Sequence, residues 1–213
     1  MPRKSSIRSR NGRKKPKTRI RIVARAKLPT RFGRFEILGI EGGSPEENAV
    51  VLVHGRVRSK TPLVRIHSQC LTGDVLSSER CDCRAQLELS LRRIAASLSG
   101  ILLYLPQEGR GIGLMNKLRA YELQDEGMDT VEANEKLGFD ADSRNYSFCA
   151  AALRLLGVTR VRLLSNNPDK VQQLESAGIR VVERVPCRPK ISHISRAYME
   201  TKRTKMGHLL DRM

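Results

Sequence analysis

Apolar and polar residues alternate along the first third of the chain, once a polar N-terminal stretch has passed. Residues 19–28, which read RIRIVARAKL, and residues 34–40, which read RFEILGI, partly follow this period of two, which is typical of strands with one buried face. Residues 49–55 and 62–67 continue the pattern. We therefore expect the N-terminal part of the fold to consist mainly of antiparallel strands, the first two of them paired.

Further along, the apolar spacing changes to three or four residues. Leu87, Leu91, Ile94 and Leu98 fall on one face of a helix, which we expect Gly100 to end. The elements predicted after it are strand 101–105, helix 114–126, helix 148–156, strand 161–164, helix 171–177, strand 179–182 and helix 196–210. Together the two parts predict an α+β or mixed α/β fold, with antiparallel strands first and alternating strands and helices after them.

The positive charge of the chain is concentrated at its N-terminus. The formal net charge is +18, but residues 1–27 hold twelve Lys and Arg and no acidic residue. Residues 1–18 are too polar to pack and are expected to form a basic disordered tail, followed by a single domain at 19–213. The tail either stays solvated and binds polyanions weakly or serves a specific nucleic-acid or protein partner, although it lacks the aromatic residues that stack on single strands.

The sequence contains no recognisable targeting or membrane-spanning segment. No apolar run approaches eighteen residues, and the basic N-terminus lacks the apolar stretch of a secretory signal. We therefore expect a cytoplasmic protein with no membrane contact. Thiols stay reduced in that compartment, and the odd number of cysteines, five, agrees with this interpretation.

Three cysteines, Cys70, Cys81 and Cys83, lie within fourteen residues. Three thiolates with no obvious fourth ligand suit a catalytic zinc ion, because a structural zinc has four protein ligands while a catalytic one keeps a position for water. Cys81 and Cys83 are expected to point to the same side of an extended segment. A disulfide, a redox pair and a four-ligand site completed by His67 or another cysteine are alternatives. Cys149 lies in an apolar run and is interpreted as a core residue, not a ligand.

A glycine-rich turn follows the predicted strand 101–105 and opens a helix. Three glycines alternate with other residues in residues 108–113, EGRGIG, and allow close backbone approach, while Arg110 adds a guanidinium that can grip a phosphate. The spacing fits neither a P-loop nor a dinucleotide-binding motif, and a plain tight turn is an equal alternative. Glu108 favours a ligand, because its carboxylate could hold the exocyclic amine and ring N–H of a guanine or coordinate Mg²⁺.

Other polar residues also suit an anionic ligand. Asp142 and Arg144 can form a pair that aims the guanidinium at a phosphoryl group, although such a pair is commonly a surface ion pair or a helix cap. Ser165 and Lys170 lie where a strand ends and a helix begins, and the alternative there is a polar turn with a cap. Tyr121, on the predicted helix after the glycine turn, is either a core residue or part of the same site.

Ordered motifs along the chain resemble those of the GTP cyclohydrolase II family. The likeness covers about residues 22–210 and leaves only the basic tail outside it. The motifs are RIHSQCLTGD at 65–74, RCDC at 80–83, QEGRGIGL at 107–114, DTVEAN at 129–134, LGF at 137–139, SNNP at 165–168 and KMGHLL at 205–210. The resemblance implies hydrolytic opening of the imidazole ring of GTP, with release of formate and pyrophosphate. The nucleotide product would be 2,5-diamino-6-ribosylamino-4(3H)-pyrimidinone 5′-phosphate, formed in the first step of riboflavin biosynthesis.

The resemblance also implies cofactors and partners. One catalytic Zn²⁺ per subunit would be held by Cys70, Cys81 and Cys83 and would supply hydroxide to C8 of the base. Mg²⁺ is expected on the triphosphate of GTP, the small-molecule substrate. A homodimer is implied by the family alone, and nucleic acid would bind at most non-specifically, through the tail.

Individual roles follow from the same resemblance. The nucleophile proposed for the family at the α-phosphorus, which displaces pyrophosphate, matches Arg144, and its proton acceptor matches Asp142. Because arginine is normally fully protonated, we favour charge stabilisation as the role of Arg144. A family tyrosine near C8, a proton donor or acceptor, matches Tyr121. The positions that match nucleotide contacts are Arg65, Ile66, His67, Ser68, Gln69, Gln86, Glu108, Gly109, Arg110, Thr130, Ser165 and Lys170.

The sequence departs from the family pattern at a few positions. Gln69 stands where Glu is common, Arg84 where Gly is common and Ser165 where Thr is common. Gln69 and Arg84 could alter substrate affinity, which leaves open a paralogue that uses the same chemistry in another pathway. A single-function form is expected, because no dihydroxybutanone phosphate synthase domain precedes the matched region. The alternative of a different class is a basic, zinc-containing protein that binds nucleic acid.

Overall fold

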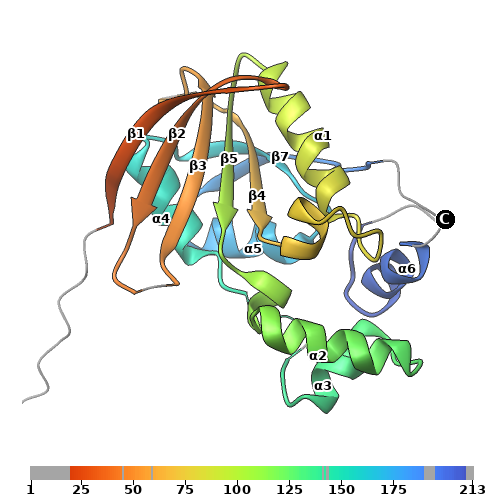
Figure 1. Ribbon diagram of the computed structural model, residues 1–213. Helices are drawn as coiled ribbons and strands as arrows, with labels where there is room; N and C mark the ends of the chain where they lie inside the picture. Colours follow the sequence, from red (N-terminus) through yellow and green to blue (C-terminus); the bar gives the residue numbers. More distant parts are fainter. Residues whose placement is uncertain are drawn as a thin grey trace, which may run out of the picture.

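A seven-stranded mixed sheet organises the protein (Figure 1). The computed structural model describes residues 20–44, 46–58, 60–140, 142, 144–189 and 195–209, without the side chains of 196 and 197. The strands are β1 (Arg21–Thr30), β2 (Gly33–Glu41), β3 (Asn48–Gly55), β4 (Leu63–Ser68), β5 (Ser99–Leu105), β6 (Arg160–Leu164) and β7 (Arg180–Val185). Their order across the sheet is β1-β2-β3-β5-β4-β6-β7.

Strand direction divides the sheet into two halves. β1, β2, β3 and β5 are antiparallel neighbours, whereas β5, β4, β6 and β7 pair in parallel. Antiparallel strands can be joined by tight turns, while parallel strands need crossover connections, and the crossovers here contain the helices. The predicted mixed α/β fold, with antiparallel strands first, is confirmed.

Helices lie on both faces of the sheet and beyond one of its ends (Figure 1). They are α1 (Cys83–Ala95), α2 (Leu114–Asp125), α3 (Thr130–Lys136), α4 (Ser147–Leu155), α5 (Pro168–Ser176) and α6 (Arg196–Thr204), with short turns η1 (Leu71–Val75) and η2 (Glu108–Gly111). One face is covered by α1, and the other by α4 and α5. Beyond the carboxyl ends of β4 and β5 lie α2 and α3, with α6 against α3.

Each face of the sheet carries its own hydrophobic core, because successive strand residues point to opposite faces. Ile101 of β5 packs in one core with Leu153 of α4, while its neighbour Leu102 packs in the other core with Ile94 of α1. Each of these side chains is at most 1% exposed, and burying one contributes about 1.5–3 kcal/mol. Cys149 of α4 also lies in the first core, which agrees with its interpretation as a core residue.

The helix predicted to run to Leu98 ends earlier than its apolar stripe. The last helical residue is Ala95, and Leu98 is 99% exposed. Ser97 Oγ donates to Ile94 O at 2.7 Å and closes the helix. Gly100 belongs to β5, where a Cβ would lie 2.7 Å from the Ile94 side chain. The chain therefore has to leave the helix early enough to enter the strand beneath it.

Two other differences concern the C-terminal half and the tail. The pattern over residues 196–210 predicts one helix, but α6 ends at Thr204. The pattern does not predict α3, whose N-terminus has a capping box between Asp129 and Glu132. The expected disordered tail at residues 1–18 lies outside the described residues. Within the described ranges, no helix has the length and apolarity needed to cross a membrane.

Replacing Ile94 should destabilise the fold far more than replacing Leu98, although both belong to one apolar stripe. Ile94 is fully buried and Leu98 is 99% exposed. We expect Ile94→Ala to lower the free energy of unfolding by about 2–5 kcal/mol and Leu98→Ala by less than about 0.5 kcal/mol. Urea titration of both variants measures the difference, and equal losses would contradict the position of the helix end.

Candidate active site

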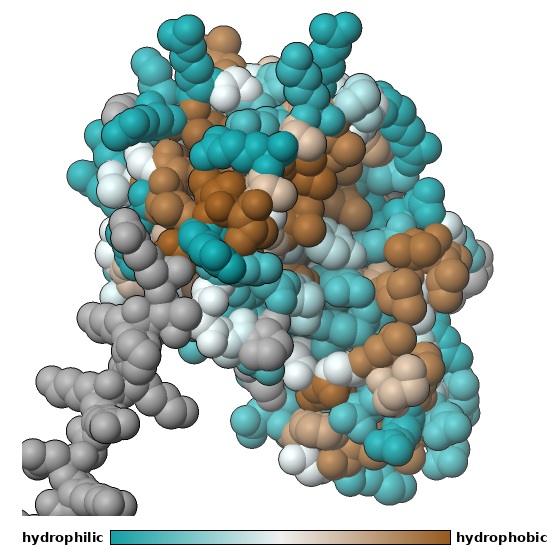
Figure 2. Space-filling view, turned by 60° about the vertical axis from the view of Figure 1, so that its left-hand side comes forward, coloured by the Kyte–Doolittle hydropathy of each residue, from teal (hydrophilic) through white to brown (hydrophobic). Residues whose placement is uncertain are grey.

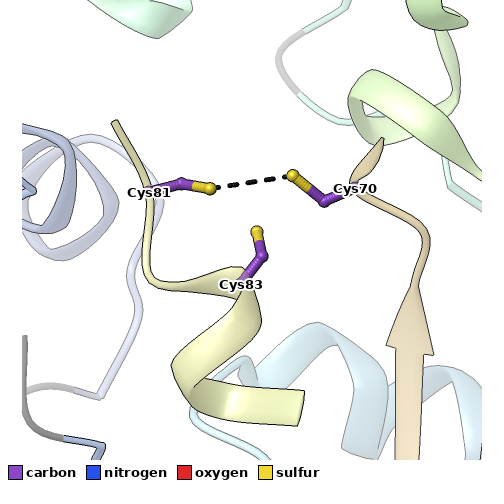
Figure 3. A group of neighbouring side chains, drawn as sticks. All are labelled: Cys70, Cys81 and Cys83. Carbon is purple, nitrogen blue, oxygen red and sulfur yellow. Dashed lines mark hydrogen bonds between the residues drawn. The ribbon is translucent and has the colours of Figure 1, made fainter. Parts of the chain in front are cut away.

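Three thiol groups point toward one another between the end of β4 and the start of α1 (Figure 3). Cys70 follows β4, Cys81 lies in a bend, and Cys83 is the first residue of α1. Their sulfur atoms all lie within 4.8 Å of one another, and Cys70 Sγ is 3.6 Å from Cys81 Sγ. A disulfide needs about 2.05 Å. The cluster therefore consists of free thiols.

The expectation that Cys81 and Cys83 share one side of an extended segment is wrong. Asp82 between them has φ −94° and ψ 10° and is the N-cap residue of α1. The start of the helix, and not a strand, brings both thiols toward Cys70. Gly73 makes this close approach possible, because a Cβ there would lie 3.0 Å from Cys81 Sγ and 3.1 Å from Cys70 Sγ.

Within the described residues, no further histidine, cysteine or carboxylate joins the three thiols as a fourth metal ligand. Cys149 and Cys187 are buried in the two hydrophobic cores. His67 turns its Nε2 toward Asp74, 3.1 Å away. The alternative of a closed four-ligand site therefore finds no partner among these residues.

The spacing and the electrostatics of the thiols fit a zinc ion. Hydrogen bonds from Cys81 and Cys83 lower the pKa of the Cys70 thiol, whereas the bond with Cys70 raises the pKa of Cys81 to about 11. Three thiols this close cannot all ionise unless a cation compensates the charge. Sulfur ligands 2.3 Å from a tetrahedral zinc lie about 3.8 Å from one another, close to the 3.6 Å observed between Cys70 and Cys81.

Asp74 holds the loop that carries Cys70. Its carboxylate accepts hydrogen bonds from Cys70 N at 3.1 Å, Tyr104 OH at 2.9 Å and His67 Nε2 at 3.1 Å. Burial lowers the pKa of His67 below its usual value, and the bond with Asp74 only partly offsets this. His67 is therefore a neutral ring that donates from Nε2.

Helix α2 presents Lys117 and Tyr121, one turn apart, to the same loop. Lys117 Nζ donates to Thr72 Oγ1 at 2.9 Å and to Glu108 Oε1 at 2.8 Å. The same ammonium group lies 3.2 Å from Cys70 Sγ. Burial opposes its charge, but the bonds with Glu108 and Cys70 raise the pKa of Lys117. Tyr121 OH shares a hydrogen bond with Thr72 Oγ1 at 3.1 Å, so Tyr121 belongs to the site and not to the core.

The glycine-rich turn after β5 forms a wall of the same pocket. Gly109 and Arg110 have φ values of 59° and 62°, in the left-handed region, and this conformation costs a non-glycine residue about 1–3 kcal/mol. Such strain is commonly found at functional sites. Glu108 Oε2 accepts a hydrogen bond from Leu71 N at 2.6 Å. The turn is therefore tied directly to the loop that carries Cys70.

Buried basic side chains line the pocket together with the thiols. Arg65 and Lys170 are only 6% and 5% exposed, and Arg144 lies beside them. Burial lowers the pKa of Lys170 well below its usual value, and repulsion from Arg65 and Arg144 adds to the effect. Concentrated positive charge of this kind favours a bound polyanion.

Asp142 and Arg144 form a largely buried ion pair and not an open surface pair. Arg144 Nε donates to Asp142 Oδ1 at 2.8 Å, Nη2 donates to the other carboxylate oxygen, and the side chains are 13% and 22% exposed. Burial opposes ionisation of Asp142, but Arg144 outweighs it and holds the pKa of the carboxyl below its usual value. Arg144 Nη1 also lies 3.5 Å from Ser68 Oγ. The guanidinium is thus held in one orientation.

Most of the predicted site residues line one pocket, and two do not. Those that line it are Arg65, His67, Ser68, Gln69, Cys70, Cys81, Cys83, Gln86, Glu108, Gly109, Arg110, Tyr121, Thr130, Arg144, Ser165 and Lys170. The side chain of Ile66 lies in the core, and its carbonyl oxygen accepts a hydrogen bond from Lys170 Nζ. Asp142 acts on the pocket through Arg144. Arg84, a departure from the family pattern, bonds to Glu88 at 3.3 Å and is not a lining residue.

Sequence reasoning missed several residues of the site. Lys117 had a usable signal, because it lies four positions before Tyr121 and therefore on the same helical face. Asp74 belongs to the first motif, but its spacing to Cys70 does not indicate that it holds the loop. Asp82 and Lys202 gave no such signal: their charged atoms are 2.7 Å apart, but 120 positions separate them in sequence.

Comparisons with known proteins agree with the resemblance in the motifs. A family model described as GTP cyclohydrolase II matches residues 21–186. A GTP cyclohydrolase-2 of Buchnera aphidicola is 52% identical over 192 residues, which cover 90% of this chain and 99% of that protein. A GTP cyclohydrolase-2 of Escherichia coli is 54% identical over 194 residues, 91% of this chain and 99% of that protein. A riboflavin biosynthesis protein of Vibrio vulnificus is 50% identical over 92% of this chain, which corresponds to 54% of its own length.

The free energy of unfolding should fall as the pH is lowered through about 6.5, and His67 should account for part of the loss. His67 is held neutral in the fold, whereas the unfolded chain protonates it below about pH 6.5. Its contribution is therefore complete above that pH and is lost in acid. Urea titrations between about pH 5 and 8, with a chelator present, should show a weaker pH dependence for His67→Gln. A wild-type pH dependence in His67→Gln would contradict this role of His67.

Proposed function

This chain belongs to the GTP cyclohydrolase II family, and from that premise we propose that it opens the imidazole ring of GTP by hydrolysis. The products are formate, pyrophosphate and 2,5-diamino-6-ribosylamino-4(3H)-pyrimidinone 5′-phosphate, in the first step of riboflavin biosynthesis. One observation carries this proposal: a cluster of three thiols and a group of buried basic side chains line the same pocket. The thiols suit a metal ion that promotes hydrolysis at carbon, and the basic side chains suit a polyphosphate.

Cys70, Cys81 and Cys83 are proposed to hold one Zn²⁺ ion per subunit. Their spacing and the absence of a fourth protein ligand within the described ranges support this assignment. When bound, the ion would supply Lewis acidity and lower the pKa of water to about 7. Lys117 Nζ, 3.2 Å from Cys70 Sγ, offsets part of the negative charge of the three thiolates.

C8 of the guanine is proposed to face the thiols, with Tyr121 beside it. The Tyr121 hydroxyl is held by Thr72 Oγ1 in the loop that carries Cys70. Burial raises the pKa of Tyr121 above its usual value. The hydroxyl therefore keeps its proton at neutral pH and acts first as a proton donor to the opening ring.

The phosphate chain is proposed to bind among the basic side chains. Arg65 and Lys170 are buried and Arg110 lines the same pocket, and a triphosphate would relieve the mutual repulsion that the basic groups now experience. Mg²⁺ would travel with the triphosphate, because this ion prefers oxygen ligands and is commonly held by substrate phosphates. Thr130 and Ser165 add neutral polar groups to the pocket.

Arg144 is proposed to stabilise charge at the α-phosphorus while a water molecule attacks this atom, the bond to the bridging oxygen breaks and pyrophosphate leaves. Burial opposes the charge of Arg144, but the hydrogen bonds with Asp142 outweigh it and raise the pKa of the guanidinium. A protonated guanidinium has no lone pair with which to attack phosphorus. Asp142 therefore orients Arg144, and the two act as one preorganised group.

We also propose a homodimer and a cytoplasmic location. Apolar residues gather on the side of the molecule where β1 to β3 lie (Figure 2). Val23 and Val50, each 44% exposed, lie beside Gly39 in this part of the sheet, and a second subunit would cover them.

Free thiols at all five cysteines suit the reducing cytoplasm. Non-specific binding of nucleic acid by the basic tail stays a prediction.

Loss of one thiol should abolish both metal binding and ring opening. Wild-type protein should bind one zinc per subunit and release formate and pyrophosphate from GTP in equal amounts. Loss of a residue that only supports a metal ligand typically lowers metal affinity or activity by about 10–100-fold. Loss of a ligand itself should cost more, so Cys83→Ser should lower formate release by more than about 100-fold. Cys149→Ala, at a cysteine buried in the core, should keep zinc and turnover. Pyrophosphate release without formate by the wild type would refute the proposed reaction.

Substitution of Arg144 should lower turnover without loss of zinc. Lysine cannot form the paired bonds with Asp142, so Arg144→Lys should reduce kcat by about 10²–10³-fold. The matched control is Arg162→Lys, which alters an exposed pair with Glu183 and should leave kcat unchanged. A pyrophosphate assay and metal analysis of both variants test this, and unchanged turnover in Arg144→Lys would contradict the assigned role.

A further inference from the structure

The aspartate between two of the thiols does not cap the helix that it begins. Asp82 is the N-cap residue of α1, where an aspartate ordinarily accepts a hydrogen bond from a backbone N–H of the first turn, yet its side chain makes no such bond. The side chain is completely buried. A buried carboxylate is stable only with cationic or hydrogen-bonding partners. The partners of Asp82 therefore determine the position of the backbone between Cys81 and Cys83.

The cationic partner of Asp82 comes from α6, 120 positions away. Lys202 Nζ lies 2.7 Å from Asp82 Oδ1, and the lysine side chain is only 10% exposed. If either residue moved away, the other charge would remain buried alone, which is strongly unfavourable. Lys202 therefore restrains the residue whose backbone joins Cys81 to Cys83.

Asp82 passes this restraint on to the basic part of the pocket. Gln86 Nε2 donates to the second carboxylate oxygen of Asp82, and Arg65 Nη2 donates to Gln86 Oε1 at 2.5 Å. Arg65 Nη1 donates to Leu164 O, at the end of β6, at 3.1 Å. A continuous chain of hydrogen bonds thus joins Lys202 of α6 to Asp82, which lies between two of the thiols, and to the buried guanidinium of Arg65.

The rest of α6 lies against the same pocket. The Tyr198 ring lies one turn before Lys202, with its centre 4.3 Å from Lys202 Nζ and 5.8 Å from the Arg110 guanidinium. After the helix, Leu209 N donates to Asn166 O at 2.9 Å. Contacts with the pocket thus lie on both sides of Lys202 in sequence, at Tyr198 and at Leu209.

We propose that Lys202 is a positioning residue for the metal site. Through Asp82 it holds Cys81 and Cys83 in the arrangement that a zinc ion needs, without touching the reacting atoms itself. This inference rests on the proposed function in one respect, the binding of zinc by the three thiols. It gives a role to α6, whose Tyr198 and Lys202 line the pocket but match none of the site residues predicted from the sequence.

Three variants and a control separate positioning from substrate contact. Lys202→Met removes the charge, Lys202→Arg keeps it, and the double variant Asp82→Asn/Lys202→Met removes both partners. Lys205→Met, on the residue that follows α6, alters a more exposed lysine paired with Asp129 and Glu132 and is the matched control. Zinc affinity is measured by competition with a chromophoric chelator, together with kcat and KM for GTP and the urea midpoint of the metal-free protein.

Lys202→Met should weaken zinc binding by about 10–100-fold and lower kcat, with KM for GTP little changed at saturating zinc. Lys202→Arg should restore most of the zinc affinity. The double variant should recover the urea midpoint that Lys202→Met loses, because no charge is left buried alone, but it should not recover zinc affinity. Lys205→Met should match the wild type in every measurement.

Wild-type zinc affinity in folded Lys202→Met would overturn the inference. A raised KM with unchanged zinc affinity would also overturn it, because Lys202 would then be a substrate contact. If Lys202→Met does not fold, the double variant decides, and wild-type zinc affinity in that protein would equally overturn the inference. A wild-type protein that binds no zinc would instead refute the proposed function, so the two failures are distinguishable.

Discussion

Parallel pairing of β4 with β5 and β6 is the constraint on which the site depends. It brings the carboxyl ends of three strands to one edge of the sheet, and the chain continues from these ends into Cys70, Glu108 and Ser165. Ligand sites commonly form at such edges, because loops and helix N-termini converge there. The antiparallel strands β1 to β3 widen the sheet and enclose its cores, but none of their described residues lines the pocket.

Charge in the pocket is arranged in two groups, the thiols and the basic side chains, and each group is only partly compensated by neighbouring charges. The thiols oppose one another's ionisation, which raises the pKa of Cys81 to about 11, and Arg65 and Arg144 contribute to the lowered pKa of Lys170. A divalent cation would relieve the repulsion among the thiols, and a polyphosphate would relieve the repulsion among the basic side chains. The fold holds both groups in place beforehand, so little reorganisation is needed when ligands arrive. Lys117 lies at the boundary, in contact with Cys70 and with the glycine-rich turn.

Local patterns in the sequence predict the strands well, because β2 and β3 keep one face in a core. The motifs predict the pocket because they follow strand ends. The predictions are wrong where packing between distant segments determines the local structure. Leu98 continues an apolar stripe, yet the chain leaves the helix before it to enter β5. Cys83 begins a helix, although its spacing from Cys81 suggests an extended segment. The pairing of Asp82 with Lys202 has no local signal at all, since it depends on the position of α6 in the finished fold.

The ion pair between Asp82 and Lys202 also has a consequence for the order in which the protein is made. The ribosome adds about 5–20 residues per second. Because 120 positions separate Asp82 from Lys202, the lysine is added about 6–24 seconds after the aspartate. During that interval the nascent chain already carries its three clustered cysteines without the lysine that restrains their turn. With Lys202 in the proposed positioning role, metal capture would await the nearly complete chain, and a translation product interrupted before α6 would carry the three cysteines without the lysine that positions them.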